Sequence, residues 1–117
     1  MIDMAALVCM GMTIFNEARG EPLQGQIAVG YVLYRRAKFD QKNICSETYK
    51  PKQFTWTSKK LRIPSYIELK PYTDLAYLII TQKEIDYSYG ANYFHHVSLG
   101  NKWGYKPKTV IANHVFY

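Results

Sequence analysis

The chain has 117 residues, enough for one hydrophobic core but too few for two, so we predict a single domain over residues 1–117. Hydrophobic residues make up 48% of it, which excludes a disordered chain. The 15 basic and 9 acidic side chains give a net charge of +6, which favours anionic partners such as nucleic acid or cell-envelope polymers.

Two helices are predicted in the first third of the chain. Apolar residues recur at three- and four-residue steps near the N-terminus, which predicts an amphipathic helix over residues 3–17. The second helix, over residues 22–38, is apolar nearly all round, so we expect it to lie in the centre of the fold. Gly20 and Pro22 separate the two, because Gly suits a helix C-terminus and Pro suits a first turn.

The junction between these helices carries two carboxylates and a guanidinium. Glu17 lies at the end of the first helix, on the shoulder of its apolar stripe, and Glu21 lies at the beginning of the second. A helix C-terminus and partial desolvation both disfavour a carboxylate, so we predict that Glu17 has the higher pKa, although Arg19 opposes this. A protonated acid beside an ionised one is what glycoside cleavage needs. The alternative is that these charges are solvated helix caps.

The middle of the chain, residues 39–65, is predicted to be mostly irregular and basic. Within it, Gln53-Phe54-Thr55-Trp56-Thr57 alternates aromatic and hydroxyl side chains. One interpretation is an edge strand or a lid that packs its rings on the core. The other is a rim on which sugars stack, because rings and hydroxyls suit the apolar face and polar edge of a carbohydrate.

The two cysteines and the N-terminal residues indicate in which cellular compartment the chain is made. Cys9 lies in the first helix and Cys45 in a polar stretch, and we predict that both are free thiols. The chain begins Met1-Ile2-Asp3, without a positively charged leader, so we expect synthesis in the cytoplasm without a signal peptide. No apolar run approaches the roughly 20 residues that span a bilayer, so we expect no stable membrane insertion.

The second half is predicted to hold a scaffold helix and a small sheet. The helix is expected over residues 67–86, and short strands at Asn92–His95 and Val110–Phe116. The fold class is therefore α+β, with a helical lobe around a buried central helix and a small β lobe.

Three histidines raise the question of a metal. His95 and His96 are adjacent on a predicted strand and therefore face opposite ways, and no second ligand cluster accompanies them or His114. We therefore predict neither a metal nor another cofactor. A hydrogen-bonding role for His95 or His114 at the site, or a structural role, remains.

Three segments together resemble the SleB/CwlJ-type cell wall hydrolases, the catalytic domain of spore-cortex lytic enzymes that also occurs in phage lysins. They are NEARGEPLQGQIAV at 16–29, GANYF at 90–94 and IANHVFY at 111–117, and QFT at 53–55 is similar to a further segment of that family. The resemblance spans nearly the whole chain. It implies a lysozyme-like α+β domain that cuts the MurNAc–GlcNAc bond of peptidoglycan as a lytic transglycosylase, leaving a 1,6-anhydro-muramyl end.

The resemblance also implies the site. The catalytic glutamate falls on Glu17, with Glu21 as the second acid, and the helix-end argument favours Glu17 over Glu21 as the catalytic one. Glu21 and Arg19 are expected to support it. The expected substrate-binding residues are Phe54, Thr55, Trp56, Tyr93, Phe94, His95 and His114.

We therefore expect a monomeric phage-type endolysin whose partner is the glycan strands of peptidoglycan and not nucleic acid. Made in the host cytoplasm, it would act on the bacterial cell wall after release. The alternatives are a hydrolytic muramidase of the same fold or a non-catalytic glycan-binding module. A small basic nucleic-acid-binding protein is a third possibility, which rests on the charge and the interleaved aromatic residues.

Overall fold

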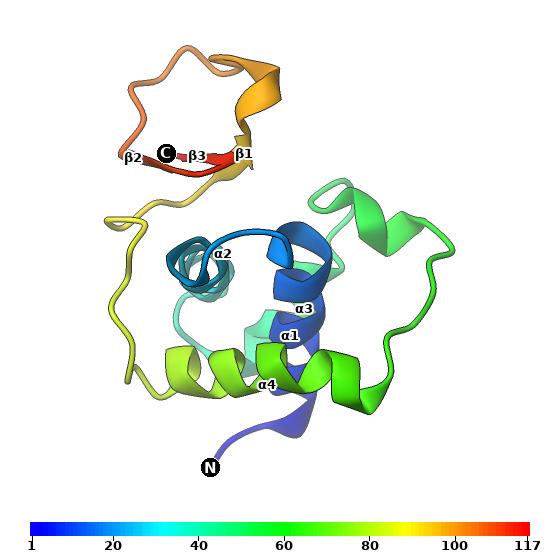
Figure 1. The fold of residues 1–117 in the computed structure, drawn as a ribbon. Coiled ribbons are helices and arrows are strands. Elements are labelled where there is room, and N and C mark those ends of the chain that lie inside the picture. The colour runs from blue at the N-terminus through cyan, green and yellow to red at the C-terminus, as the bar shows by residue number, and fades with distance from the viewer.

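The computed structural model describes all 117 residues and shows a body of helices with a small sheet at one end (Figure 1). The helices are α1 (Met4–Ala18), α2 (Leu23–Arg36), α3 (Ile44–Thr48) and α4 (Tyr66–Ile80). Short 3-10 turns are η1 (Gln41–Asn43), η2 (Thr55–Ser58) and η3 (Val97–Leu99). The strands are β1 (Phe94–His96), β2 (Thr109–Ile111) and β3 (His114–Phe116). The predicted α+β class is confirmed. None of the helices is both long and apolar enough to cross a membrane.

Helix α1 forms as its sequence predicts. The Asp3 side chain caps its N-terminus by accepting a hydrogen bond from the backbone N–H of Ala5 at 2.9 Å. Its apolar stripe is buried against α4, and the two helices approach closely at Gly11, where an added Cβ would lie 2.8 Å from the Thr73 methyl group. The helix ends at Ala18, one residue after Glu17, so the acid stands on the last turn of a firmly packed helix.

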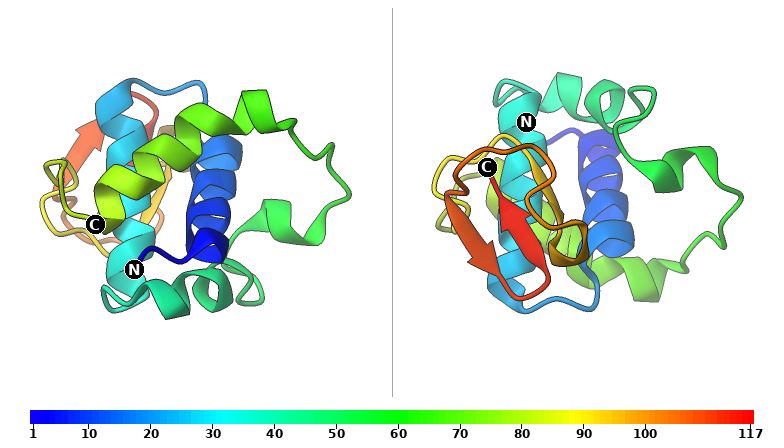
Figure 2. Two further views of the ribbon diagram at one scale, coloured as in Figure 1. Left: turned by 90° about the horizontal axis from the view of Figure 1, so that it is seen from below. Right: turned by 90° about the horizontal axis from the view of Figure 1, so that it is seen from above.

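Helix α2 is the buried central helix, as predicted. Every residue from Ile27 to Tyr34 is buried, because α1 and α4 cover one side of the helix and the sheet covers another (Figures 1 and 2). Pro22 precedes its first turn, and Arg35 and Arg36 occupy its last turn, where cations are favourable.

The prediction of free thiols is wrong, because Cys9 and Cys45 form a disulfide. Residues 39–65 were expected to be mostly irregular, but they contain α3, which packs against α1 and brings the two Cα atoms to 5.3 Å. Ile44 is fully buried there, so this short helix anchors a segment whose composition looks polar.

Helix α4 begins one residue before the predicted start and ends six before the predicted end. A capping box between Ser65 and Glu68 fixes its beginning, and it accommodates Pro71 within its second turn. Gln82, with φ 56°, turns the chain away after the helix ends. Ile85, which lies within the predicted range, is therefore outside the helix and 68% exposed.

The sheet is antiparallel with the strand order β1-β3-β2. The strand predicted at Val110–Phe116 is in fact a hairpin, in which Ala112, at φ 47°, reverses the chain between β2 and β3. No Gly marks this turn in the sequence, so its reversal was not predicted. Phe116 of the central strand is fully buried, and Ile111 of β2 packs near Gly25 of α2, which seats the sheet on the central helix.

Candidate active site

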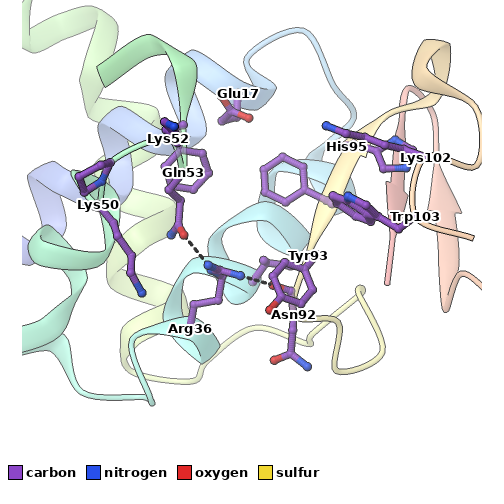
Figure 3. Close-up of a pocket in the computed structure, with 14 residues that line it drawn as sticks. Glu17, Arg36, Lys50, Lys52, Gln53, Asn92, Tyr93, His95, Lys102 and Trp103 are labelled. Atoms are coloured by element: carbon purple, nitrogen blue, oxygen red, sulfur yellow. Dashed lines mark hydrogen bonds between the residues drawn. The ribbon is translucent and has the colours of Figure 1, made fainter. Parts of the chain in front are cut away.

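A cleft of about 460 Å³ lies where the end of α1, the side of α2, the turn before η2 and strand β1 meet (Figure 3). Its lining combines aromatic rings, basic side chains and one carboxyl. The lining residues are Glu17, Val32, Arg36, Lys50, Pro51, Lys52, Gln53, Phe54, Asn92, Tyr93, Phe94, His95, Lys102 and Trp103.

Glu17 is the only acidic residue in this lining. Its carboxyl points from the last turn of α1 into the cleft, between the Gln53 wall and the His95 wall (Figure 3). Thr13 and Ile14, one turn earlier, are fully buried, so the carboxyl emerges from the edge of the core. Burial raises the pKa of Glu17 from 4.5 to about 7. Near neutral pH a large share of this carboxyl is therefore protonated and able to donate a proton.

Glu21 lies outside the cleft and fastens the helix junction to the sheet. Its carboxylate accepts hydrogen bonds from the backbone N–H and the side-chain amide of Asn113, in the β2–β3 turn, both at 2.9 Å. Burial alone would raise the pKa of Glu21, but these hydrogen bonds outweigh it and the pKa is lowered. The predicted order of the two pKa values is confirmed. Burial of Glu17 was an expected cause, whereas the hydrogen bonds from Asn113 to Glu21 were not.

We predict that Glu21→Ala lowers the free energy of unfolding by about 2 to 3 kcal/mol, because it removes both charge-assisted hydrogen bonds to the hairpin. Asn113→Ala keeps the backbone N–H and should have the smaller effect. The lowered pKa of Glu21 means that this stabilisation is present above pH 4.5 and is lost as the pH falls through the folded-state pKa. Urea unfolding of both variants at pH 7 checks the prediction, and equal stabilities of Glu21→Ala and wild type would contradict it.

Arg19 forms no ion pair and no side-chain hydrogen bond with either acid. Its guanidinium lies 4.5 Å from the centre of the Phe15 ring, and it donates a 3.4 Å hydrogen bond to the Phe15 carbonyl. It does not line the cleft. The structure therefore does not bring Arg19 together with Glu17, although the sequence places them two residues apart.

Aromatic rings form much of the cleft on both sides of Glu17. Tyr93 and Trp103 meet edge to face with ring centres 5.9 Å apart, and Phe54 faces Phe94 at 6.3 Å. Phe54 is nearly buried, whereas half of Tyr93 is exposed to the cleft and solvent. Of the predicted substrate-binding residues, the structure thus gathers Phe54, Tyr93, Phe94 and His95 around Glu17.

The remaining members of the 53–57 segment point elsewhere. This segment is neither an edge strand nor extended, because Thr55 to Ser58 form the turn η2. Trp56 is 8% exposed and packs between Tyr49 and Phe54, with its ring on the core, as one of the two interpretations expected. Trp56 lines a separate hollow of about 170 Å³. Thr55 lines neither the cleft nor this hollow.

His95 lines the cleft but both of its ring nitrogens are engaged. Nδ1 is 2.8 Å from the carbonyl of His96, which can only accept, so Nδ1 donates and Nε2 accepts from the Tyr117 hydroxyl at 3.0 Å. The ring also packs on Trp103, with centres 4.8 Å apart. This arrangement uses His95 to hold the aromatic wall rather than to move a proton.

His114 does not reach the cleft. It is buried, packs on Phe94, and has Nδ1 3.7 Å from the Glu21 carboxylate. Burial lowers the pKa of His114 despite Glu21, so the ring is neutral near pH 7 and forms no ion pair. No group of three or more His, Cys, Asp or Glu side chains is arranged to hold a metal ion.

Arg36 was not predicted as a site residue and is the main organiser of the cleft floor. It donates to the side chains of Glu47 and Gln53 and to the Asn92 carbonyl, and its guanidinium lies 4.6 Å from the Tyr93 ring centre. It thereby joins the two walls (Figure 3). In the sequence, Arg36 is one of several basic residues in the last turn of a predicted helix, and nothing there indicates a role in the site. Gln53 was indicated only by the QFT segment that resembles the family.

The fold is an α+β domain, and its cleft places a protonatable carboxyl among aromatic rings, an arrangement that suits a glycosidic bond. The chain belongs to the cell wall hydrolase family, whose sequence model, described as Cell Wall Hydrolase, matches residues 20–117. The match begins three residues after Glu17. No significant match to a curated protein or to a solved structure was found. Family membership makes the chain a peptidoglycan-degrading enzyme.

Proposed function

We propose that the protein is a lytic transglycosylase that cuts the MurNAc–GlcNAc bond with Glu17 as its single catalytic acid and base. The observation that carries this proposal is that one carboxyl lines the cleft. Hydrolytic glycosidases generally place two carboxyls about 5 to 9.5 Å apart across the bond, one of which attacks the sugar or activates water. Glu21 is hydrogen-bonded to Asn113 outside the lining and is not placed for that second role.

The reaction then needs only one residue that first gives and later takes a proton. Protonated Glu17 donates its proton to the glycosidic oxygen, the C1–O bond breaks, and an oxocarbenium-like centre forms on the muramyl sugar. The C6 hydroxyl of the same sugar attacks C1, and ionised Glu17 accepts the hydroxyl proton. The products are a 1,6-anhydro-muramyl end and a free GlcNAc hydroxyl, and Glu17 is again protonated.

The other cleft residues suit a glycan strand. Tyr93, which is half exposed, and Trp103, which is half-buried, offer ring surface to sugar rings, while Arg36 joins this wall to Gln53 on the other side. The net charge of +6 keeps the protein near anionic envelope polymers.

Digestion of purified sacculi followed by mass analysis of the fragments tests the proposal. We expect every new muramyl end to be lighter by one water than a hydrolysed end. Ends of full mass would instead identify a hydrolytic muramidase. Binding to sacculi without any released muropeptide would identify a glycan-binding module.

The pKa of Glu17 predicts the pH dependence of cleavage. Because the acid must be protonated and its pKa is raised to about 7, kcat/KM should fall roughly tenfold per pH unit above that value. Below it, the rate should level off. Initial rates on sacculi between pH 5 and about 9, with folding monitored in parallel, provide the measurement. A rate that keeps rising through pH 8 would exclude Glu17 as the proton donor.

We further propose that the protein works as a monomeric, phage-type endolysin on the wall after release from the cytoplasm. The disulfide between Cys9 and Cys45 supports action outside the reducing cytoplasm, since disulfides persist in oxidising surroundings. Purified protein added to bacteria whose outer layers have been permeabilised should lower the turbidity of the suspension. Unchanged turbidity would contradict this role.

A further inference from the structure

Two lysines of the cleft have no ionic partner. The lining holds four lysine or arginine side chains, Arg36, Lys50, Lys52 and Lys102, against the one acid Glu17. Arg36 is bound to Glu47 and Gln53, and Lys50 lies 4.0 Å from Glu47. The side chains of Lys52 and Lys102 form no ion pair and donate no hydrogen bond. They leave the cleft with positive charge that no protein group neutralises.

The two lysines stand on opposite walls with Glu17 between them (Figure 3). Lys52 belongs to the turn before η2, and the Lys102 ammonium lies 5.8 Å from the centre of the Trp103 ring. Neither lowers the pKa of Glu17, whose shift is upward and caused by burial. Their charge is therefore not used to stabilise the ionised catalytic acid and is free for a ligand.

A tight turn of the backbone positions Lys52. Lys50 to Gln53 form a turn closed by a 3.1 Å hydrogen bond from the Gln53 N–H to the Lys50 carbonyl, with Pro51 second and Lys52 third. Lys52 has φ 65°, the left-handed region that Gly or Asn adopts with least strain at this position of a turn. The turn therefore sets the Lys52 side chain at the edge of the cleft.

We propose that Lys52 and Lys102 determine specificity by binding carboxylates of the lactyl-peptide substituent on the muramyl sugar. This inference rests on the proposed function. In peptidoglycan that substituent carries either a free lactyl carboxylate or a stem peptide with carboxylates of its own. A lysine ammonium, a compact charge on a flexible stem, suits a carboxylate that is itself on a flexible chain. Glycans of N-acetylglucosamine alone lack this group.

The variants Lys52→Gly, Lys102→Met and their combination test the proposal. On glycan strands with stem peptides, each single change should lower kcat/KM by up to about fivefold and the pair by up to about 20-fold, the upper end for exposed charge pairs. The loss should appear in KM, and added salt should weaken wild type more than the double variant. Lys52→Gly should melt no lower than wild type, because Gly relieves the backbone strain.

Lys60→Met is the matched control, because Lys60 is an exposed lysine that does not line the cleft. It should leave kcat/KM unchanged. Strands whose stems have been removed by an amidase identify the source of the carboxylate. The amidase frees the lactyl carboxylate, which is tied up as an amide in strands that carry stems. A lysine effect that disappears on the treated strands assigns the stem carboxylates, and one that persists shows that the lysines also bind the freed lactyl carboxylate; both support the proposal.

A double variant with wild-type kcat/KM on both kinds of strand would overturn the role of the lysines and leave the proposed cleavage intact. If instead the wild-type protein released no muropeptides from either substrate, the proposed function would fail first, and this inference would fail with it.

Discussion

Glu17→Gln is expected to lower kcat for peptidoglycan cleavage by at least 10²-fold, and by up to about 10⁴-fold, because it removes the proton donor while keeping the shape of the side chain. KM should change little, since the aromatic walls that contact the glycan are untouched. The measurement is the rate of turbidity loss of purified sacculi, together with the fragments released. Wild-type clearing by Glu17→Gln would show that another group supplies the proton.

The same variant has a predictable effect on stability, which separates loss of chemistry from loss of fold. Burial raises the pKa of Glu17 from 4.5 to about 7 in the folded protein. The stability associated with the neutral carboxyl is therefore fully present below pH 4.5 and is lost as the pH rises through 7, by on the order of 3 kcal/mol. Because Gln does not ionise, Glu17→Gln should be more stable than wild type at pH 8.

Glu21→Gln serves as the matched control for activity, because it changes the neighbouring carboxylate by the same chemistry. It keeps one oxygen to accept a hydrogen bond from Asn113, so the hairpin should stay attached. We expect it to retain most of the wild-type kcat. A loss as large as that of Glu17→Gln would reverse the assignment of the two acids.

Removing the disulfide is the second large effect. The Cys9–Cys45 bond closes a loop with a sequence separation of 36 and ties α3 to α1. Closure of a loop of this length stabilises a protein by on the order of 3 to 4 kcal/mol, chiefly by restricting the unfolded chain. The double variant Cys9→Ala, Cys45→Ala should lose this much free energy of unfolding, measured by urea titration.

Reduced wild-type protein should match the double variant, since both lack the bond. Thiol titration of the unreduced protein in denaturant should find no free thiol, because both cysteines are paired. Two reactive thiols, or oxidised and reduced forms of equal stability, would contradict the prediction.

The elements that periodicity and caps define were predictable from the sequence. Helices α1 and α2 were expected within a few residues of their observed ends, because their apolar spacing and the Gly20 and Pro22 signals are local. The burial of α2 also followed from its apolar surface. Two elements were not predicted. Helix α3 is held by packing on α1 and by the disulfide, which are contacts between distant parts of the chain, and the β2–β3 turn has no Gly to mark it.

The candidate site divides in the same way. Glu17, Arg19 and Glu21 are close in the sequence, which suggested that they act together. A helix turns about 100° per residue, and the chain reverses direction after α1 ends, so the three side chains point in different directions. Glu17 faces the cleft, Arg19 stacks on Phe15, and Glu21 holds the hairpin. The catalytic role of Glu17 and the single-domain organisation remain predictions.

The sequence by itself determined the α+β class and the buried central helix, because apolar spacing is a local property of the chain. The higher pKa of Glu17 was predicted from its place at a helix end beside apolar residues, but burial in the folded core and the hydrogen bonds from Asn113 to Glu21 produce it. Only the tertiary structure decided which residues share the cleft. Arg36, Lys52, Tyr93 and Lys102 come from four separate segments. Their meeting depends on α2 being buried beneath β1, since side chains distant in the chain are brought together by burial of the core and not by local preference.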